Sequence, residues 1–163
     1  MIDIKNTTQQ HQGIAKHLLA AHALTGCDTV SYMFGLGKLT MLKTLNKHHP
    51  LQLMGQRDSD MDGVITEASK FITACYGCKP QHNMSDTRYA VWKHRLANVK
   101  ASAAPLLKSL PPTTEAFSEH VHRAHYQAFV WMSAAFPDPP DMDPTDYGWT
   151  GSEAITIRPR MLA

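Results

Sequence analysis

Apolar residues recur every three or four positions in several segments of the chain, which is the spacing that places side chains on one face of a helix. The segments with this pattern are residues 12–24, 39–45, 64–75, 85–96 and 117–136. Gly26 is placed to end the first helix, Ser85 and Asp86 are predicted to cap the fourth, and a Leu-Pro-Pro run precedes the last. The pattern predicts a mostly α fold, with residues 1–136 forming a single-domain helical bundle.

Residues 137–163 form a tail rich in proline and aspartate, beginning Pro-Asp-Pro-Pro-Asp. Proline favours extended backbone and cannot continue a helix, so an extended tail is expected. Tyr147 and Trp149 are predicted to anchor this tail on the helical domain. Ile155 and Ile157 fit a short edge strand.

The composition is typical of one intracellular domain. The chain has 163 residues, of which 43% are apolar, enough for one core. The formal net charge of +2 is far from the strongly basic balance of many nucleic-acid-binding proteins. No apolar run approaches the roughly 18 residues that a membrane span needs, so no membrane partner is expected. The three cysteines, an odd number, fit a reducing compartment.

A Gly-Leu-Gly-Lys turn leads into the second predicted helix. Glycine at Gly35 and Gly37 permits positive φ and a close approach by a ligand backbone. The helix start exposes backbone N–H groups at the positive end of the helix dipole, which suits a phosphate. Leu36 completes the turn, and Lys38 and Lys43 add charge. The turn therefore predicts a nucleic-acid-binding site, with a purely structural loop as the alternative.

The spacing before this turn resembles the flap endonuclease superfamily of PIN-like nucleases. A Gly-x-Asp motif, Gly26 to Asp28, stands seven residues before the Gly-Leu-Gly turn. The resemblance implies a helix–turn–helix over residues 25–45, in which the turn grips a duplex phosphate and Asp28 helps to hold a catalytic divalent metal such as magnesium. Thr29 departs from the family's usual aromatic residue, and Met41 stands where the family prefers alanine.

A second resemblance extends over nearly the whole chain. Segments such as AHALTGCDTVSYMFGLGK, SLPPTTEAFSEHVHRAHYQAFVW and DPPDMDPTDYGW are similar to the C-terminal portion of uncharacterised, mobile-element-associated animal proteins. Asp3 is the sole acidic residue before Asp28, whereas two-metal phosphoryl chemistry needs a cluster of carboxylates. We therefore expect a chain that lacks most of a nuclease catalytic core.

Three aspartates upstream of the third predicted helix match the first half of a calcium-binding EF-hand loop. Asp58, Asp60 and Asp62 occupy ligand positions one, three and five, and Gly63 occupies position six. Position twelve, normally a bidentate glutamate, is Ser69. The alternative is an acidic lead-in to a helix, which the helix dipole favours.

Cysteine and histidine residues give two further metal hypotheses. Cys75 and Cys78 have the spacing of half a structural zinc site, with His82 as a third ligand, although Cys75 also fits the core face of its helix. His122 and His125, with His120, lie on the last predicted helix. Their expected role is a solvated, weakly basic face rather than a metal site.

The leading hypothesis is a sequence-independent DNA-binding module without catalysis of its own, partnered by an upstream nuclease core or another protein, and intracellular, in the nucleus. One alternative is a stand-alone magnesium-dependent nuclease that uses Asp28 with Asp58, Asp60 and Asp62. Another is a helical protein-interaction module or a degenerate mobile-element product without activity.

Overall fold

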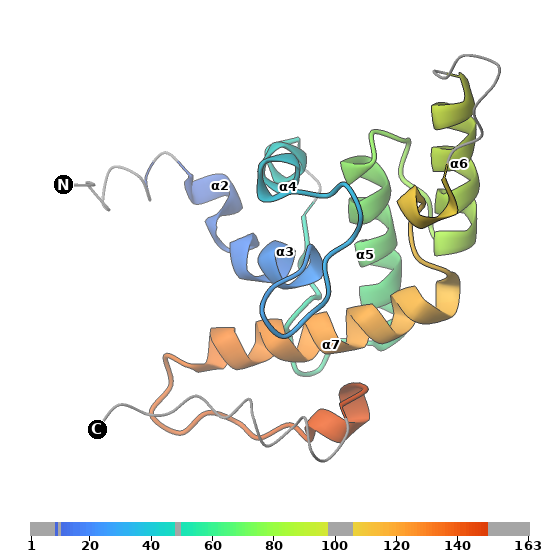
Figure 1. Cartoon of the computed structure of the whole chain (residues 1–163). Helices are drawn as coiled ribbons and strands as arrows, with labels where there is room; N and C mark the ends of the chain where they lie inside the picture. The colour runs from blue at the N-terminus through green and yellow to red at the C-terminus, as the bar shows by residue number, and fades with distance from the viewer. Residues whose placement is uncertain (1–8, 10, 48–49, 98–105, 150–163) are drawn as a thin grey trace.

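The structure, a computed structural model, describes residue 9 and residues 11–47, 50–97 and 106–149. Within these ranges it is mostly helical and has no strand, which confirms the predicted fold class. The elements, drawn in Figure 1, are α2 (Gln12–Ala15), α3 (Leu18–Leu24), α4 (Lys38–Leu45), α5 (Met61–Cys75), α6 (Met84–Ala97), η1 (Leu107–Ser109), α7 (Thr114–Ser133) and η2 (Pro144–Tyr147).

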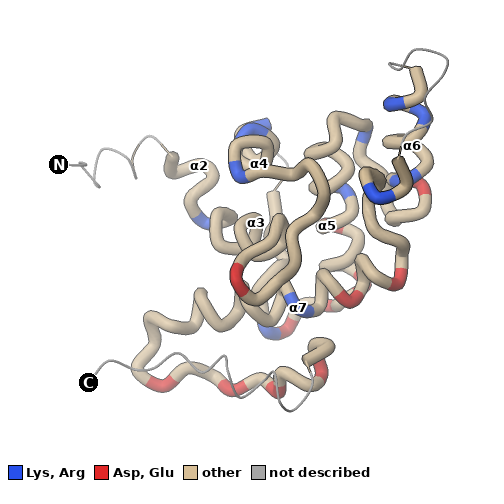
Figure 2. Tube along the Cα trace, in the orientation of Figure 1, with Lys and Arg blue, Asp and Glu red and all other residues tan. Residues whose placement is uncertain are grey.

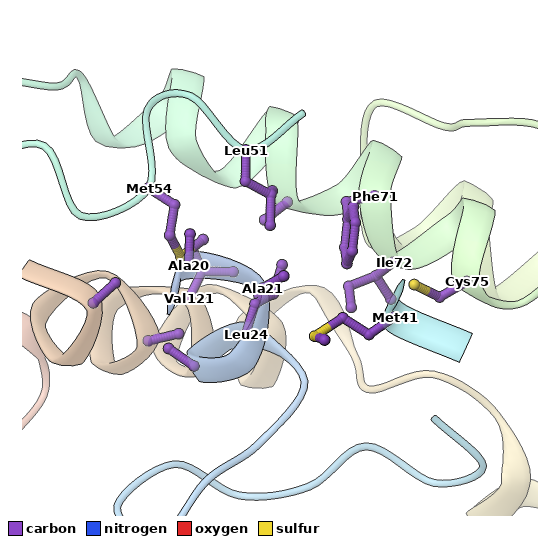
Figure 3. Packing of buried hydrophobic residues seen from close by; sticks show 14 of the residues in the cluster. Ala20, Ala21, Leu24, Met41, Leu51, Met54, Phe71, Ile72, Cys75 and Val121 are labelled. Atoms are coloured by element: carbon purple, nitrogen blue, oxygen red, sulfur yellow. The ribbon is translucent and has the colours of Figure 1, made fainter. Parts of the chain in front are cut away.

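The core lies where α3 crosses the long helix α7, with α5 packed on α7 and α4 on α5 (Figure 1). Ala20 and Ala21 of α3 are fully buried, and such small side chains let helices approach closely. Met41 of α4 is buried in the same hydrophobic cluster as Ile72 and Cys75 of α5 and lies near Ile72 (Figure 3). The methionine that departs from the flap endonuclease pattern is therefore a core residue of the α4–α5 contact.

Side chains cap the starts of three helices. The Asp60 carboxylate accepts from the Gly63 N–H at 3.0 Å at the start of α5, and the Thr113 hydroxyl accepts from the first turn of α7. Asn83 Oδ1 accepts from the Asp86 N–H at 2.8 Å and caps α6. The predicted cap at Ser85 and Asp86 was therefore wrong by about two residues, and Asp86 instead supplies the third position of the helix.

The first predicted helix is broken in two. A turn at residues 16–17 separates α2 from α3, and the His17 N–H bonds the Ile14 carbonyl in a three-residue turn. His17 is buried there, and its Nδ1 lies 3.1 Å from the Leu51 carbonyl oxygen, to which it donates. The break in the helix therefore lies where the His17 side chain makes a hydrogen bond to a residue distant in the sequence.

Residues 25–37 do not form the helix–turn–helix that the flap endonuclease resemblance implies. α3 ends at Leu24, and α4 begins only after the Gly-Leu-Gly turn. No helix lies between Leu24 and the turn. Val30 is buried, and the Thr29 hydroxyl donates to Gln127 Oε1 of α7. The segment is thus held in a non-helical path by contacts with α7, and the turn follows this segment rather than a helix.

The described part of the tail, residues 137–149, lies along α7 (Figure 1). Trp149 is buried, and the Tyr147 ring stacks on His125 at a centroid distance of 5.7 Å. Arg123 Nε donates to the Gly148 carbonyl at 3.0 Å. Tyr147 and Trp149 therefore contact the domain as predicted, whereas the strand predicted at residues 155–157 lies outside the described residues.

Candidate nucleic-acid interface

The Gly-Leu-Gly turn is open to solvent on its glycine side. Gly35 has a φ of +76°, in the left-handed region, and Gly37 has extended backbone with φ −93° and ψ 165°. A Cβ added at either glycine would meet nothing within 4 Å. Leu36 between them is buried and fixes the turn to the body. A ligand can therefore approach the backbone here without displacing any side chain.

The start of α4 lacks a side-chain cap. The N–H groups of Thr40 and Met41 donate to the Gly37 carbonyl, while the amides of Lys38 and Leu39 precede the first helical hydrogen bonds. No acidic residue occupies the first turn. Positive helix-end charge is thus left uncompensated at an exposed position, and Leu39 beside it is 74% exposed.

Lys38 does not point toward this open end. Its ammonium group donates to the His22 carbonyl at 2.9 Å, to the Thr25 hydroxyl at 3.1 Å and to the Gly26 carbonyl. Partial burial lowers the pKa of Lys38. The lysine that the sequence assigns to a phosphate therefore caps the C-terminal end of α3, where cations are favoured.

His120 completes the same helix end. Its Nε2 donates to the Leu24 carbonyl at 2.7 Å, so Nδ1 is the acceptor that faces the Ser31 hydroxyl at 3.4 Å. Burial lowers the pKa of His120, consistent with a neutral ring. The Ala21 carbonyl accepts from the Thr25 hydroxyl. The last carbonyls of α3 therefore accept hydrogen bonds from His120 of α7, from Lys38 of α4 and from Thr25.

His125 is likewise buried, so the predicted solvated histidine face is wrong for His120 and His125. The Gly55 N–H donates to His125 Nδ1 at 3.1 Å. Burial, with a smaller contribution from His122, lowers the pKa of His125 to about 4. His122 alone of these three is half-buried.

Charge is unevenly distributed over the described surface. Lys43 and Lys47 are exposed on and just after α4, and Figure 2 shows further lysine and arginine residues on α6. The acidic residues gather along the tail and the start of α7 (Figure 2). Asp28 is exposed just beyond α3 and lies near His22. Burial and the charge of Lys38 lower the pKa of His22, and the Asp28 carboxylate partly offsets this by raising it.

The predicted metal ligands are not brought together. Among the described residues, no three His, Cys, Asp or Glu side chains lie close enough to hold a metal ion. Asp60 is used as the α5 cap, and Asp58 and Asp62 are exposed. Asp28 therefore does not join the three aspartates in a magnesium site, and the calcium ligands do not converge either.

Glu67, the glutamate nearest the end of the EF-hand-like loop, has another role. Its two carboxylate oxygens accept from the backbone N–H groups of Gln52 and Leu53 at 2.8 and 2.9 Å. It therefore ties the segment before α5 to that helix and is not available as a calcium ligand.

The zinc candidates are also separated. Cys75 is buried toward Met41, and burial raises the pKa of its thiol to about 11, which opposes the thiolate form that zinc requires (Figure 3). Burial also raises the pKa of Cys78, and His82 is exposed. Cys75 is a core residue, which is the alternative that its helical spacing indicated.

Two exposed aromatic residues, Tyr32 and Phe34, precede the turn and were not singled out by the sequence. They are 66% and 54% exposed. The Lys38 ammonium lies 5.7 Å from the Tyr32 ring centroid, and the Phe34 carbonyl accepts from the Tyr76 hydroxyl at 3.0 Å. The sequence signal that could have identified them is the position of two aromatic residues between Gly26 and Lys38, next to the predicted phosphate-binding turn.

Comparison of the chain with protein-family models, curated proteins and solved structures finds no significant match. The resemblances to flap endonucleases and to mobile-element-associated proteins stay predictions. No helix in the described ranges combines the length and the apolar character that crossing a bilayer requires.

Proposed function

We propose that the chain binds nucleic acid through its phosphate backbone, without reading base sequence, at the N-terminal end of α4. The observation that carries this proposal is the open and uncapped helix start. Gly35 and Gly37 leave space for a ligand, and no acidic side chain occupies the first turn of the helix.

In this proposal a phosphate oxygen accepts from the amides of Lys38 and Leu39 and so replaces the missing cap. Lys43 adds an exposed positive charge from the last turn of α4. The Lys38 side chain acts indirectly, because it holds the turn against the end of α3. With few cations involved, the affinity is modest and falls with added salt.

The test is the substitution Gly37→Asp. Gly37 has extended backbone and open surroundings, so an aspartate fits there and serves as the N-cap that α4 lacks. The variant is expected to be as stable as the wild type, or more stable by a few tenths of a kcal/mol, while its carboxylate occupies the phosphate position. We expect its affinity for duplex DNA, measured by fluorescence anisotropy, to fall at least about tenfold.

Asn46→Asp is the matched control, because it adds the same charge at the opposite end of α4, where Asn46 is exposed. If both variants lose affinity equally, only net charge matters and the proposed seat is wrong. If neither variant loses affinity, α4 is not the binding element.

A protein-interaction module is the second candidate. Leu106 and Leu107 are 64% and 78% exposed beside α6, and adjoining exposed apolar residues often mark protein interfaces. Failure of the wild-type chain to bind any oligonucleotide would favour this candidate.

A further inference from the structure

One face of α6 presents aromatic and basic side chains to solvent. Tyr89, Trp92, Lys93 and Leu96 are spaced so that they share this face. Tyr89 is 63% exposed, Trp92 38% and Leu96 43%, and Lys93 is exposed as well. The Tyr89 and Trp92 rings stack with their centroids 6.2 Å apart and their planes 26° apart. The two rings thus form one exposed aromatic platform.

The opposite face of α6 holds this platform rigidly. Met84, Thr87 and Val91 are buried, and the Thr87 hydroxyl lies 2.6 Å from that of Thr73 in α5. On the flanks, Arg88 donates to the Pro111 carbonyl. Because α6 is fastened on these sides, its aromatic face is already in place before any ligand arrives.

A series of side-chain contacts connects α6 to the turn before α4. The Phe34 carbonyl just before the turn accepts from the Tyr76 hydroxyl, and the Arg95 guanidinium lies 5.8 Å from the centre of the Tyr76 ring. Arg95 belongs to α6 and also donates to the Ser109 carbonyl. Tyr76 and Arg95 therefore lie between the proposed phosphate seat and the α6 platform, and Arg95 contributes positive charge along the way.

We propose that the α6 platform binds unpaired bases of a single-stranded nucleic acid, which stack on Tyr89 and Trp92 while the backbone contacts the basic residues nearby. This inference rests on the proposed function and adds the class of ligand. The α6 segment carries three Lys or Arg residues, Arg88, Lys93 and Arg95, against one acid, Asp86. This charge favours a polyanion and disfavours a second copy of the same face. Aromatic rings beside cations are the usual means of holding single strands.

The experiment titrates the full chain with an oligodeoxythymidylate of about 10 nucleotides, a length within the range for one single-strand site, and in parallel with a duplex. Trp92→Ala and Tyr89→Ala are expected to bind the single strand roughly 5- to 150-fold more weakly, the loss that removal of one stacking contact gives. Trp92→Phe, which keeps a ring, should lose far less. Duplex affinity should stay the same in all three variants, because paired bases are not available to stack.

Phe136→Ala is the matched control, since Phe136 is an aromatic residue 60% exposed beyond the end of α7. Quenching of tryptophan fluorescence gives a second readout: single-strand binding should quench the wild type and not Trp92→Ala. Circular dichroism checks that each variant keeps its helices.

The outcomes separate this inference from the proposed function. If Trp92→Ala and Tyr89→Ala bind the single strand like the wild type, while Gly37→Asp weakens both ligands, the platform proposal is wrong and the phosphate seat stands. If Phe136→Ala loses as much affinity as Trp92→Ala, the platform proposal is also wrong. Loss of single-strand affinity in the α6 variants alone supports the platform.

Discussion

The role of Lys38 as a helix cap can be tested by Lys38→Met, which keeps the apolar stem of the side chain and removes its ammonium group. In the wild type that group donates to the carbonyls of His22 and Gly26 and to the Thr25 hydroxyl. Without it, the two carbonyls at the end of α3 lose their charged donor. The Thr25 hydroxyl keeps its own bond to Ala21.

The expected cost follows from these contacts. A hydrogen bond from a charged donor contributes about 1.5–3 kcal/mol when it is well shielded. Lys38 is only partly buried, so water replaces part of what is lost. We therefore expect Lys38→Met to lower the free energy of unfolding by about 1–2 kcal/mol, including the lost interaction with the dipole of α3.

The measurement is urea unfolding followed by far-ultraviolet circular dichroism. Lys43→Met is the control, because Lys43 is exposed on the same helix, and its change should stay within about 0.5 kcal/mol. An equally small change for Lys38→Met would refute the capping role. If Lys38→Met left the free energy of unfolding unchanged and yet lowered DNA affinity, Lys38 would be a phosphate ligand, as the sequence predicted.

Three further predictions concern other parts of the fold. Because the pKa of His125 is lowered to about 4 in the native chain, the unfolded chain binds more protons than the native one below about pH 6.5. The contribution of His125 to the free energy of unfolding is therefore complete above about pH 6.5 and is lost as the pH falls, by up to about 1.4 kcal/mol per pH unit. Urea unfolding of His125→Asn should show a shallower decline of stability with falling pH than the wild type. Gly26→Ala should lower the free energy of unfolding by about 2–4 kcal/mol, because φ is +101° and the new Cβ would lie 2.7 Å from the Tyr32 Cα. Gly35→Ala has open space around it and should lower the free energy of unfolding by about 1 kcal/mol. Comparable losses for the two variants in urea unfolding would contradict this account. Glu67→Gln should lower the free energy of unfolding by about 1 kcal/mol, and calcium should leave the wild-type melting temperature unchanged; a calcium-dependent rise would restore the EF-hand hypothesis.

The helices could be predicted where their signals are local. The apolar spacing located α4, α5 and α7, because each of these helices buries a stripe of its apolar residues. It also located α6, although the apolar residues that suggested this helix, Tyr89, Trp92 and Leu96, are exposed and its buried face consists of Met84, Thr87 and Val91. The break between α2 and α3 could not be predicted in this way, because it depends on a hydrogen bond from His17 to Leu51, distant in the sequence. The non-helical path of residues 25–37 depends in the same way on contacts with α7.

The buried histidines of α7 show a signal that was available and was overlooked. Phe117, Val121 and Ala124 mark the buried stripe of this helix. His120 and His125 fall on the same stripe, three or four residues from these positions. Their polarity pointed to solvent, but their spacing pointed to the core, and the spacing was the better guide. Which carbonyl or amide each ring meets depends on α3 and on the segment before α5, and no local pattern specifies it.

The candidate site lies at a helix start that has no side-chain cap, a feature that α4 shares with the short helices α2 and α3. The C-terminal end of α3 is supplied with donors by Lys38 and His120, and the starts of α5, α6 and α7 carry side-chain caps. The start of α4 has glycine at the cap position, where an aspartate would fit. Glycine at that position costs only a few tenths of a kcal/mol relative to a polar cap, so stability alone places little constraint on the choice. The phosphate hypothesis therefore depends on what approaches Gly37. A gain in stability together with a loss of DNA affinity in Gly37→Asp would mean that the open helix end serves binding, because a purely structural turn would show the first effect without the second.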